Sequence, residues 1–224
     1  MARLPRLVIP GLPHHVTQRG NGRAQTFFSD ADYAFYRDLL AASCLAAKVE
    51  IWAWVLMPNH VHLILVPSDE NGLRRALAPL HRRYAGRVHA RLERTGHFWQ
   101  GRFGAVALDE EHLMAAVRYV ALNPVRARLV DRPDEWRWSS VHAHLSGLDD
   151  GITALEPVLS RFPRFAEFIE NAGDPDALIR LRRAESIGRP LGSERFLETL
   201  EAQTNRPLKP AKRGPKPRVE TGPG

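Results

Sequence analysis

Two apolar runs separated by only two residues constrain the fold of this chain more than any other feature. Val49 to Met57 and His60 to Val66 are rich in β-branched and aromatic residues, and only Pro58 and Asn59 stand between them. Runs of this kind joined by so short a turn are typical of two antiparallel strands. The sequence therefore predicts a β-hairpin within the main domain.

The segments around this hairpin alternate between strand and helix patterns. In chain order, they predict a strand from Pro13 to Arg19, a helix from Ser29 or Asp30 to about Ala47, the hairpin, a helix from about Leu73 to Arg94, strand residues from Phe98 to Leu108 and a helix from Asp109 to Leu122. This order favours an α+β fold in which helices cover an antiparallel sheet.

Turn-forming and acidic residues gather at residues 146–151 and indicate a boundary. We place a main domain at residues 1–147, a small helical C-terminal extension at 148–204 and a proline-rich tail at 205–224. Two helices are expected in the extension, at about Pro175 to Ser186 and Ser193 to Gln203. They are either a helix-turn-helix-like DNA reader or a helical appendage that packs on the main domain.

Most of the net positive charge of the chain lies in its C-terminal tail. The net charge is +7, and six lysines and arginines with no acid lie between Asn205 and Arg218. Four prolines in the same stretch prevent a continuous helix. We interpret this tail as disordered and in contact with nucleic acid, with a merely solubilising extension as the alternative.

Two absences limit the classes of protein to consider. No stretch approaches the roughly 20 apolar residues that span a bilayer, so we expect a cytoplasmic protein with no membrane partner. The single cysteine, Cys44, excludes an internal disulfide and a multi-cysteine zinc site. Any metal must therefore be held by histidine, aspartate, glutamate or amide groups.

The sharpest candidate site is the pair His60 and His62, directly after the hairpin turn. Strand side chains alternate between faces, so both imidazoles point to one side, close enough to share a metal ion. Val61 and Leu63 then face the opposite layer. The alternative is a pair of structural histidines that are satisfied at the end of the sheet.

Other histidines are less suited to a shared ion. His142 and His144 have the same spacing but fall where a helix is expected, and helical positions i and i+2 point about 200° apart. His14 and His15 are adjacent on a strand and face opposite sides, so at most one of them can join a site.

One tyrosine differs from the other three. Tyr33, Tyr36 and Tyr84 fall on or near apolar helix stripes and have ordinary core explanations. Tyr119 is rotated about 100° from the buried Val120, so we expect its hydroxyl to leave the core. Asn123 lies one turn further on the same side, where it is either a metal ligand or the cap of a helix from Pro124 through Leu129.

The predicted helix from Leu73 to Arg94 is strongly basic outside its apolar stripe. Between residues 74 and 94 it carries seven arginines: Arg74, Arg75, Arg82, Arg83, Arg87, Arg91 and Arg94. Arginine forks suit phosphates. Phe98, Trp99, Gln100 and Arg102 follow and could stack on or clamp unpaired bases. Core aromatics beside a soluble helix are the alternative.

Four motifs in a fixed order closely resemble the REP-associated branch of the single-tyrosine HUH transposases. They are Met57 to Ile64, Trp99 to Phe103, Tyr119 to Ala127 and Trp136 to Ser140, and His14 to Asn21 also resembles the first strand of that family. The resemblance covers roughly residues 13–145. It implies a ferredoxin-like or RRM-like sheet with the histidine pair on a central strand and the tyrosine on a helix.

The resemblance also implies a chemistry. Mg²⁺ or Mn²⁺ would be bound by His60, His62 and Asn123, although many relatives have glutamine at the last position. Tyr119 would attack a phosphate of single-stranded DNA, which gives a 5′-phosphotyrosyl enzyme and a free 3′-hydroxyl. Because the ester linkage is conserved, another 3′-hydroxyl can reverse the step and join strands.

The partners implied by the resemblance are REP-like palindromes that fold into single-stranded DNA hairpins. The expected DNA-binding residues are Arg19, Arg82, Arg83, Arg102 and Arg126. A cytoplasmic, nucleoid-associated protein is expected, either a monomer or a homodimer. Two other functions stay open: a catalytically inactive, domesticated nucleic-acid-binding protein of the same fold, and a metal-dependent hydrolase with a water nucleophile, which would leave Tyr119 without a role.

Overall fold

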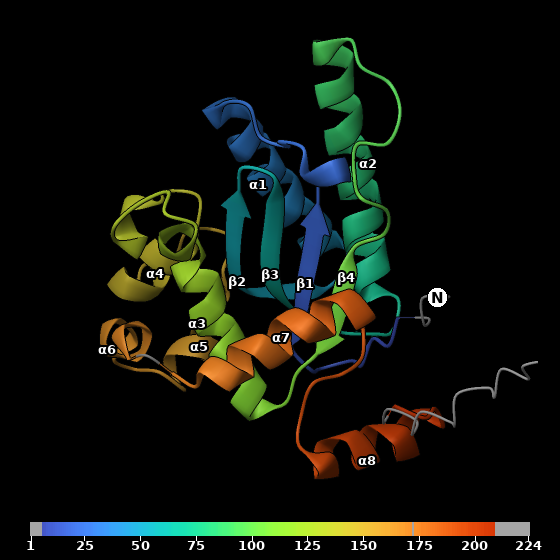
Figure 1. The fold of residues 1–224 in the computed structure, drawn as a ribbon, viewed down its shortest axis with the longest axis vertical. Helices are drawn as coiled ribbons and strands as arrows, with labels where there is room; N and C mark the ends of the chain where they lie inside the picture. Colours follow the sequence, from blue (N-terminus) through green and yellow to red (C-terminus); the bar gives the residue numbers. More distant parts are fainter. Residues whose placement is uncertain (1–5, 172, 209–224) are drawn as a thin grey trace, which may run out of the picture.

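A four-stranded antiparallel sheet forms the centre of the computed structural model, which describes residues 6–171 and 173–208 (Figure 1). Its strands are β1 (His14–Arg19), β2 (Val49–Met57), β3 (His60–Pro67) and β4 (Gly104–Ala107), in the spatial order β2-β3-β1-β4. β2 and β3 pair antiparallel, which confirms the predicted hairpin. Most of the predicted basic tail, from residue 209 onward, lies outside the described residues.

Helices cover both faces of the sheet, which confirms the predicted α+β fold (Figure 1). One face packs against α1 (Asp30–Ala46) and α2 (Gly72–Leu92), and the other against α3 (Glu110–Arg126). The later helices are α4 (Val141–Ser146), α5 (Glu156–Leu159), α6 (Phe165–Glu170), α7 (Pro175–Ile187) and α8 (Glu194–Thr204). No helix in the described part of the chain is long and apolar enough to cross a membrane.

The core between the sheet and helices α1 and α2 follows the strand alternation. Val61, Leu63 and Leu65 of β3 are fully buried in it, as predicted for residues opposite the histidine pair. Tyr36 and Tyr84 are also fully buried there. Burying these apolar side chains supplies about 2 kcal/mol each and fixes the face of β3 that carries the histidines.

The core on the other face includes the C-terminal extension. Ile64 of β3 and Val117 of α3 are buried together with Phe165 of α6 and Leu181 of α7. Both helices expected in the extension are present, and α7 packs on α3 and β4, so the extension packs on the main domain. This arrangement brings residues far along the chain close to the face of β3 that carries the histidines.

The segment Trp136–Ser140 covers the free edge of β2. The backbone N–H of Leu56 donates to the carbonyl of Trp138 at 2.9 Å, and that of Ser140 donates to the carbonyl of Trp54 at 2.9 Å. Unpaired strand edges invite pairing with other chains. This motif, one of the four that carry the family resemblance, therefore has a structural role at the sheet edge.

Two predicted boundaries were wrong. α3 does not end at Leu122 but continues through Asn123 and Pro124 to Arg126, so Asn123 is not the cap of a following helix. A proline in the last turn removes one helical hydrogen bond, and here the ring is buried, which compensates for that loss. The strand predicted from Phe98 begins only at Gly104, with an isolated bridge from Trp99 to Gly20 before it.

Burial of several histidines outside the predicted metal-ligand set makes the fold sensitive to acid. Burial lowers the pKa of His14 and of His144 to about 4 and that of His81 to about 3. The unfolded chain takes up protons near pH 6.5 while the folded chain resists them, so unfolding becomes easier as the pH falls from about 6.5 to about 4. We expect urea denaturation to measure a loss of roughly 1–2 kcal/mol per histidine between pH 7.5 and pH 5.

His81 provides the specific variant for this prediction, because its Nε2 is hydrogen-bonded to the hydroxyl of Tyr36 at 3.0 Å. His81→Gln removes the titrating group and should reduce the difference in unfolding free energy between the two pH values. The exposed His142, changed to Gln, is the matched control and should leave that difference unchanged. An undiminished difference in His81→Gln would contradict the prediction.

Candidate active site

The two histidines of the hairpin lie side by side on the face of the sheet that α3 covers. In the register of β3 with β1, His60 pairs with Arg19 and His62 with Thr17. The centroids of the two imidazole rings are 4.8 Å apart. Their common orientation follows from the alternation of strand side chains, because both sit at even positions with the core residue Ile64.

Tyr119 of α3 faces this pair. Its ring centroid lies 5.0 Å from that of His62 and 5.9 Å from that of His15, both in edge arrangements. Only 7% of its surface is exposed, so the side chain is more deeply buried than the prediction that its hydroxyl leaves the core implied. α3 is covered on two sides, by the sheet and by α7. More of its surface is therefore buried than the single apolar stripe that the sequence indicates. The ring of Tyr119 nevertheless contacts two imidazoles as well as the apolar core.

Asn59, in the hairpin turn, fixes the tautomer of His60. Its amide nitrogen donates to the carbonyl of Arg23 at 3.0 Å, which leaves its oxygen to accept from Nδ1 of His60 at 2.6 Å. Burial, with the nearby charge of Arg19, lowers the pKa of His60 to about 3, so the ring is neutral at pH 7. The proton of the neutral ring is on Nδ1, and Nε2 carries the lone pair that a metal ligand needs.

His62 is linked to a third imidazole, that of His15 on β1. Nδ1 of His62 lies 3.0 Å from Nε2 of His15, and the rings are stacked with an interplanar angle of 12°. Burial, then the neighbouring His15 and His60, holds the pKa of His62 well below its usual value. His14 points elsewhere and donates to the carbonyl of Leu12, so only one of the two adjacent histidines joins the site, as predicted.

The donor set fits a divalent ion held partly by the protein. His60 and His62 offer two neutral imidazoles, and Asn123 stands one turn after Tyr119 on the same helix, where a carboxamide oxygen suits a hard cation. Within the described residues, no group of three His, Cys, Asp or Glu side chains is placed to hold a metal ion. The amide of Asn123 is the candidate for a third protein ligand, and phosphate or water would complete the shell.

Two guanidinium groups lie beside the tyrosine. The Cζ atoms of Arg126 and Arg182 are each 5.7 Å from the centroid of the Tyr119 ring. Partial burial lowers the pKa of Arg126, and the nearby positive charge of Arg182 lowers it further. Sequence reasoning identified Arg126 but missed Arg182, because no local pattern connects α7 with a tyrosine about 60 residues earlier.

The other predicted DNA-binding residues lie near the end of the sheet where β1 pairs with His60. Arg82 and Arg83 are exposed on α2, and Arg102 is exposed in the segment before β4. The indole N–H of Trp99 donates to the carbonyl of His81 at 3.0 Å, which connects that segment to α2 next to Arg82.

The aromatic residues of that segment are used within the protein. Phe98 and Trp99 are half-buried, and their ring centroids lie 5.8 and 5.9 Å from that of Tyr84. These contacts favour the alternative, core aromatics beside a soluble helix, over rings that are free to stack on unpaired bases. Their packing against a buried core residue holds the segment in place.

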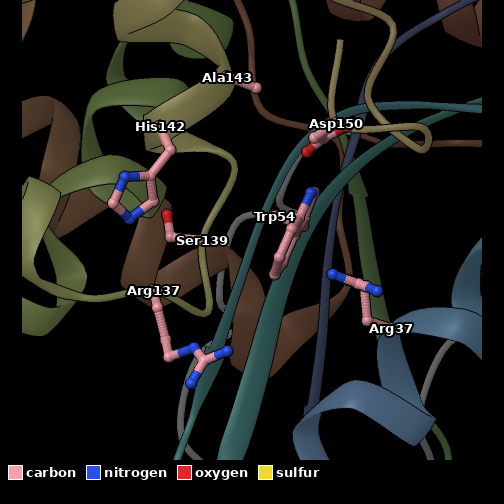
Figure 2. Close-up of a pocket in the computed structure, with 7 residues that line it drawn as sticks. All are labelled: Arg37, Trp54, Arg137, Ser139, His142, Ala143 and Asp150. Carbon is pink, nitrogen blue, oxygen red and sulfur yellow. The ribbon is translucent and has the colours of Figure 1, made fainter. Parts of the chain in front are cut away.

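A separate cavity of about 310 Å³ lies at the edge of β2, and none of the predicted site residues lines it (Figure 2). Its lining includes Arg37, Arg137, Trp54 and Asp150. Both guanidinium groups have acidic partners: Arg137 pairs with Asp30 at 2.9 Å, and Arg37 with the adjacent Asp38 at 3.1 Å. Because both guanidinium groups already form ion pairs within the protein, the histidine and tyrosine cluster is the stronger candidate site.

Comparisons with known proteins show what this chain is similar to. A family model described as "Transposase IS200 like" matches residues 9–123. The fold is similar to that of a REP-associated tyrosine transposase bound to a REP hairpin, with a TM-score of 0.57 and 24% identity over 69% of this chain and 92% of that chain. A presumed transposase from Deinococcus radiodurans R1 is 18% identical over 53% of this chain and 95% of that chain, with a TM-score of 0.38. No curated protein matches.

Proposed function

Because this chain belongs to the IS200-like transposase family, we propose that it cleaves and rejoins single-stranded DNA through a covalent bond to Tyr119. The observation that carries the proposal is the approach of the Tyr119 ring to His62, with ring centroids 5.0 Å apart, beside the second imidazole of His60. A nucleophile, two metal-ligating groups and positive charge are the parts that phosphoryl transfer requires. Tyr119, the two imidazoles and Arg126 lie on one face of the sheet, which supports the proposal.

His60, His62 and Asn123 would hold the divalent ion, Mg²⁺ or Mn²⁺. Bound there, the ion would act as a Lewis acid on a phosphoryl oxygen. Asn59 keeps Nε2 of His60 available for it, as described above. Coordination through Nε2 of His62 requires the proton on Nδ1, where it is donated to Nε2 of His15 across 3.0 Å. His15 thereby orients the ring of His62.

The remaining residues act on the tyrosine and the DNA strand. A tyrosine phenol has a pKa of about 10 in water, so attack at neutral pH needs positive charge near the oxygen. Arg126, 5.7 Å from the ring, supplies charge of this kind. The phenolate oxygen attacks phosphorus, the bond to the 3′-oxygen breaks, and the products are a 5′-phosphotyrosyl enzyme and a strand with a free 3′-hydroxyl. Attack by another 3′-hydroxyl reverses the step.

The proposed substrate is a DNA hairpin of the REP type, the partner named for the structurally similar transposase. The positive side chains proposed to contact its backbone are Arg19, Arg82, Arg83, Arg102 and Arg126. Arginine forks bind phosphate oxygens in pairs, which suits a strand that must be held while one phosphate reacts. Binding of this kind should weaken steeply with added salt.

The proposal is tested by incubating the full chain with hairpin oligonucleotides carrying single-stranded flanks, in Mg²⁺ or Mn²⁺. A protein–DNA adduct that survives denaturing electrophoresis supports it. Retention of DNA without cleavage would instead indicate an inactive, domesticated binding protein. Cleavage without an adduct would indicate a hydrolase with a water nucleophile, and either of these two results overturns the proposal.

Asn123 allows a graded test of the third ligand. We expect Asn123→Ala to lower the initial rate of adduct formation by about 10- to 100-fold, because the shell loses an oxygen donor. Asn123→Gln keeps the carboxamide and should retain more of the rate than Asn123→Ala. Rates are compared at several Mn²⁺ concentrations, and the loss in the alanine variant should diminish as the ion is raised. Equal rates in all three proteins would remove Asn123 from the site.

A further inference from the structure

We propose that Arg182 of α7 is an additional catalytic residue that contacts the phosphate attacked by Tyr119. The proposal rests on the function proposed above and adds to it a group from outside the matched family region, which ends at residue 123. The Cζ atom of Arg182 lies 5.7 Å from the Tyr119 ring centroid, as near as that of Arg126. The C-terminal extension thus supplies part of the active site.

The helix that carries Arg182 is held firmly against the main domain (Figure 1). Leu181 and Ala184 of α7 are buried in the core shared with α3 and the sheet, and Ala177 of the same helix is also buried. Because α7 is packed along one face, it cannot rotate about its own axis, and the direction in which its other residues project is fixed. The position of residue 182 beside Tyr119 is therefore a property of the packed fold, and Arg182 itself is exposed, where substrate can reach it.

A second set of contacts fixes the start of α7. The side chain of Asp174 accepts from the backbone N–H groups of Asp176 and Ala177, and so caps the helix. Arg180 reaches both Asp174, at 3.1 Å, and the ring of His112 on α3, at 3.4 Å. Arg180 is thus occupied in joining the two helices, whereas Arg182, half a turn further, points to the tyrosine.

The charges around the tyrosine indicate an anionic ligand. Partial burial, and then the positive charge of the nearby Arg182, lowers the pKa of Arg126. In the part of the chain that the structure describes, neither forms an ion pair with a carboxylate. Two neighbouring guanidinium groups are stabilised when they share an anion. A DNA phosphate presented to Tyr119 is that anion.

The position also suits the reaction. Charge on the phosphoryl oxygens is redistributed as the phenolate attacks and the 3′-oxygen leaves, and a fixed cation beside the nucleophile stabilises that state. Arg182 is then required for the rate of the step more than for the capture of the hairpin, because the strand is held mainly by the other arginines. This separation of rate from affinity distinguishes a catalytic contact from a general backbone contact.

The test compares Arg182→Ala, Arg182→Lys and Arg183→Ala, the last a control at the next, exposed position of α7. Single-turnover adduct formation and equilibrium binding of the same hairpin are measured for each. We expect Arg182→Ala to lower the adduct rate roughly 10- to 100-fold while the dissociation constant changes less than about threefold. Arg182→Lys should recover part of the rate, and Arg183→Ala should match the wild type.

The outcomes separate this inference from the proposed function. If the wild type forms the adduct and Arg182→Ala forms it at the same rate, Arg182 has no catalytic role although the function stands. If Arg182→Ala is faster, the side chain obstructs the site and the inference is overturned. A rate loss explained wholly by weaker binding would make Arg182 a backbone contact only. If the wild type forms no adduct, the proposed function fails first, and the inference fails with it.

Discussion

Tyr119→Phe should abolish the covalent attachment of DNA to the protein, with the rate reduced at least about 10³-fold. The substitution removes only the phenolic oxygen. The phenyl ring can keep its edge contacts with His62 and His15, so the arrangement of the imidazoles is preserved. The loss then reports on the nucleophile and not on the packing of α3. Adduct formation on a hairpin oligonucleotide is measured by denaturing electrophoresis after incubation with Mn²⁺.

Tyr33→Phe is the matched control for this variant. Tyr33 is buried in the core on the other face of the sheet, where its ring stacks on Phe27 and Trp138. We expect this protein to form the adduct at the wild-type rate. Both variants should bind the hairpin with unchanged affinity and unfold at wild-type urea concentrations. A Tyr119→Phe protein that still becomes attached to DNA would show that another side chain is the nucleophile.

Much of the fold could be predicted because its determinants are local. The turn at Pro58 and Asn59, between two strongly β-forming runs, specifies a hairpin without help from distant residues. Period-two alternation then assigns His60 and His62 to one face. The end of α3 was mispredicted because Asn-Pro usually terminates a helix, and here the burial of Pro124 outweighs that preference. Buried surface is a tertiary property that no short window of sequence contains.

The candidate site was harder to predict, because the exposure of a residue on α3 depends on which other elements pack against that helix. A single apolar stripe on α3 suggested that Tyr119 points to solvent, but α7 covers the helix from a second side. The contact of His15 with His62 requires the register of β1 against β3, which is decided by long-range pairing. Arg182 is the extreme case, because its place beside the tyrosine exists only once the C-terminal extension has packed.

The other large expected effect concerns the metal ligands. His60→Ala and His62→Ala should each lower the rate of adduct formation by about 10²- to 10³-fold and should weaken the binding of Mn²⁺ measured by calorimetry without DNA. The second measurement is independent of cleavage, so it separates loss of the ion from damage to the nucleophile. His60 is partly exposed at the end of β3, and its replacement should cost less stability than that of the buried His62.

His142→Ala is the natural control, since His142 and His144 repeat the spacing of the predicted ligands on a helix instead of a strand. If spacing alone made a metal site, this variant would also lose Mn²⁺. We expect it to keep both ion binding and adduct formation, because helical geometry directs the two rings apart. Unchanged Mn²⁺ binding in both His60→Ala and His62→Ala would place the ion elsewhere, and Tyr119 would then lack the partner on which its proposed role depends.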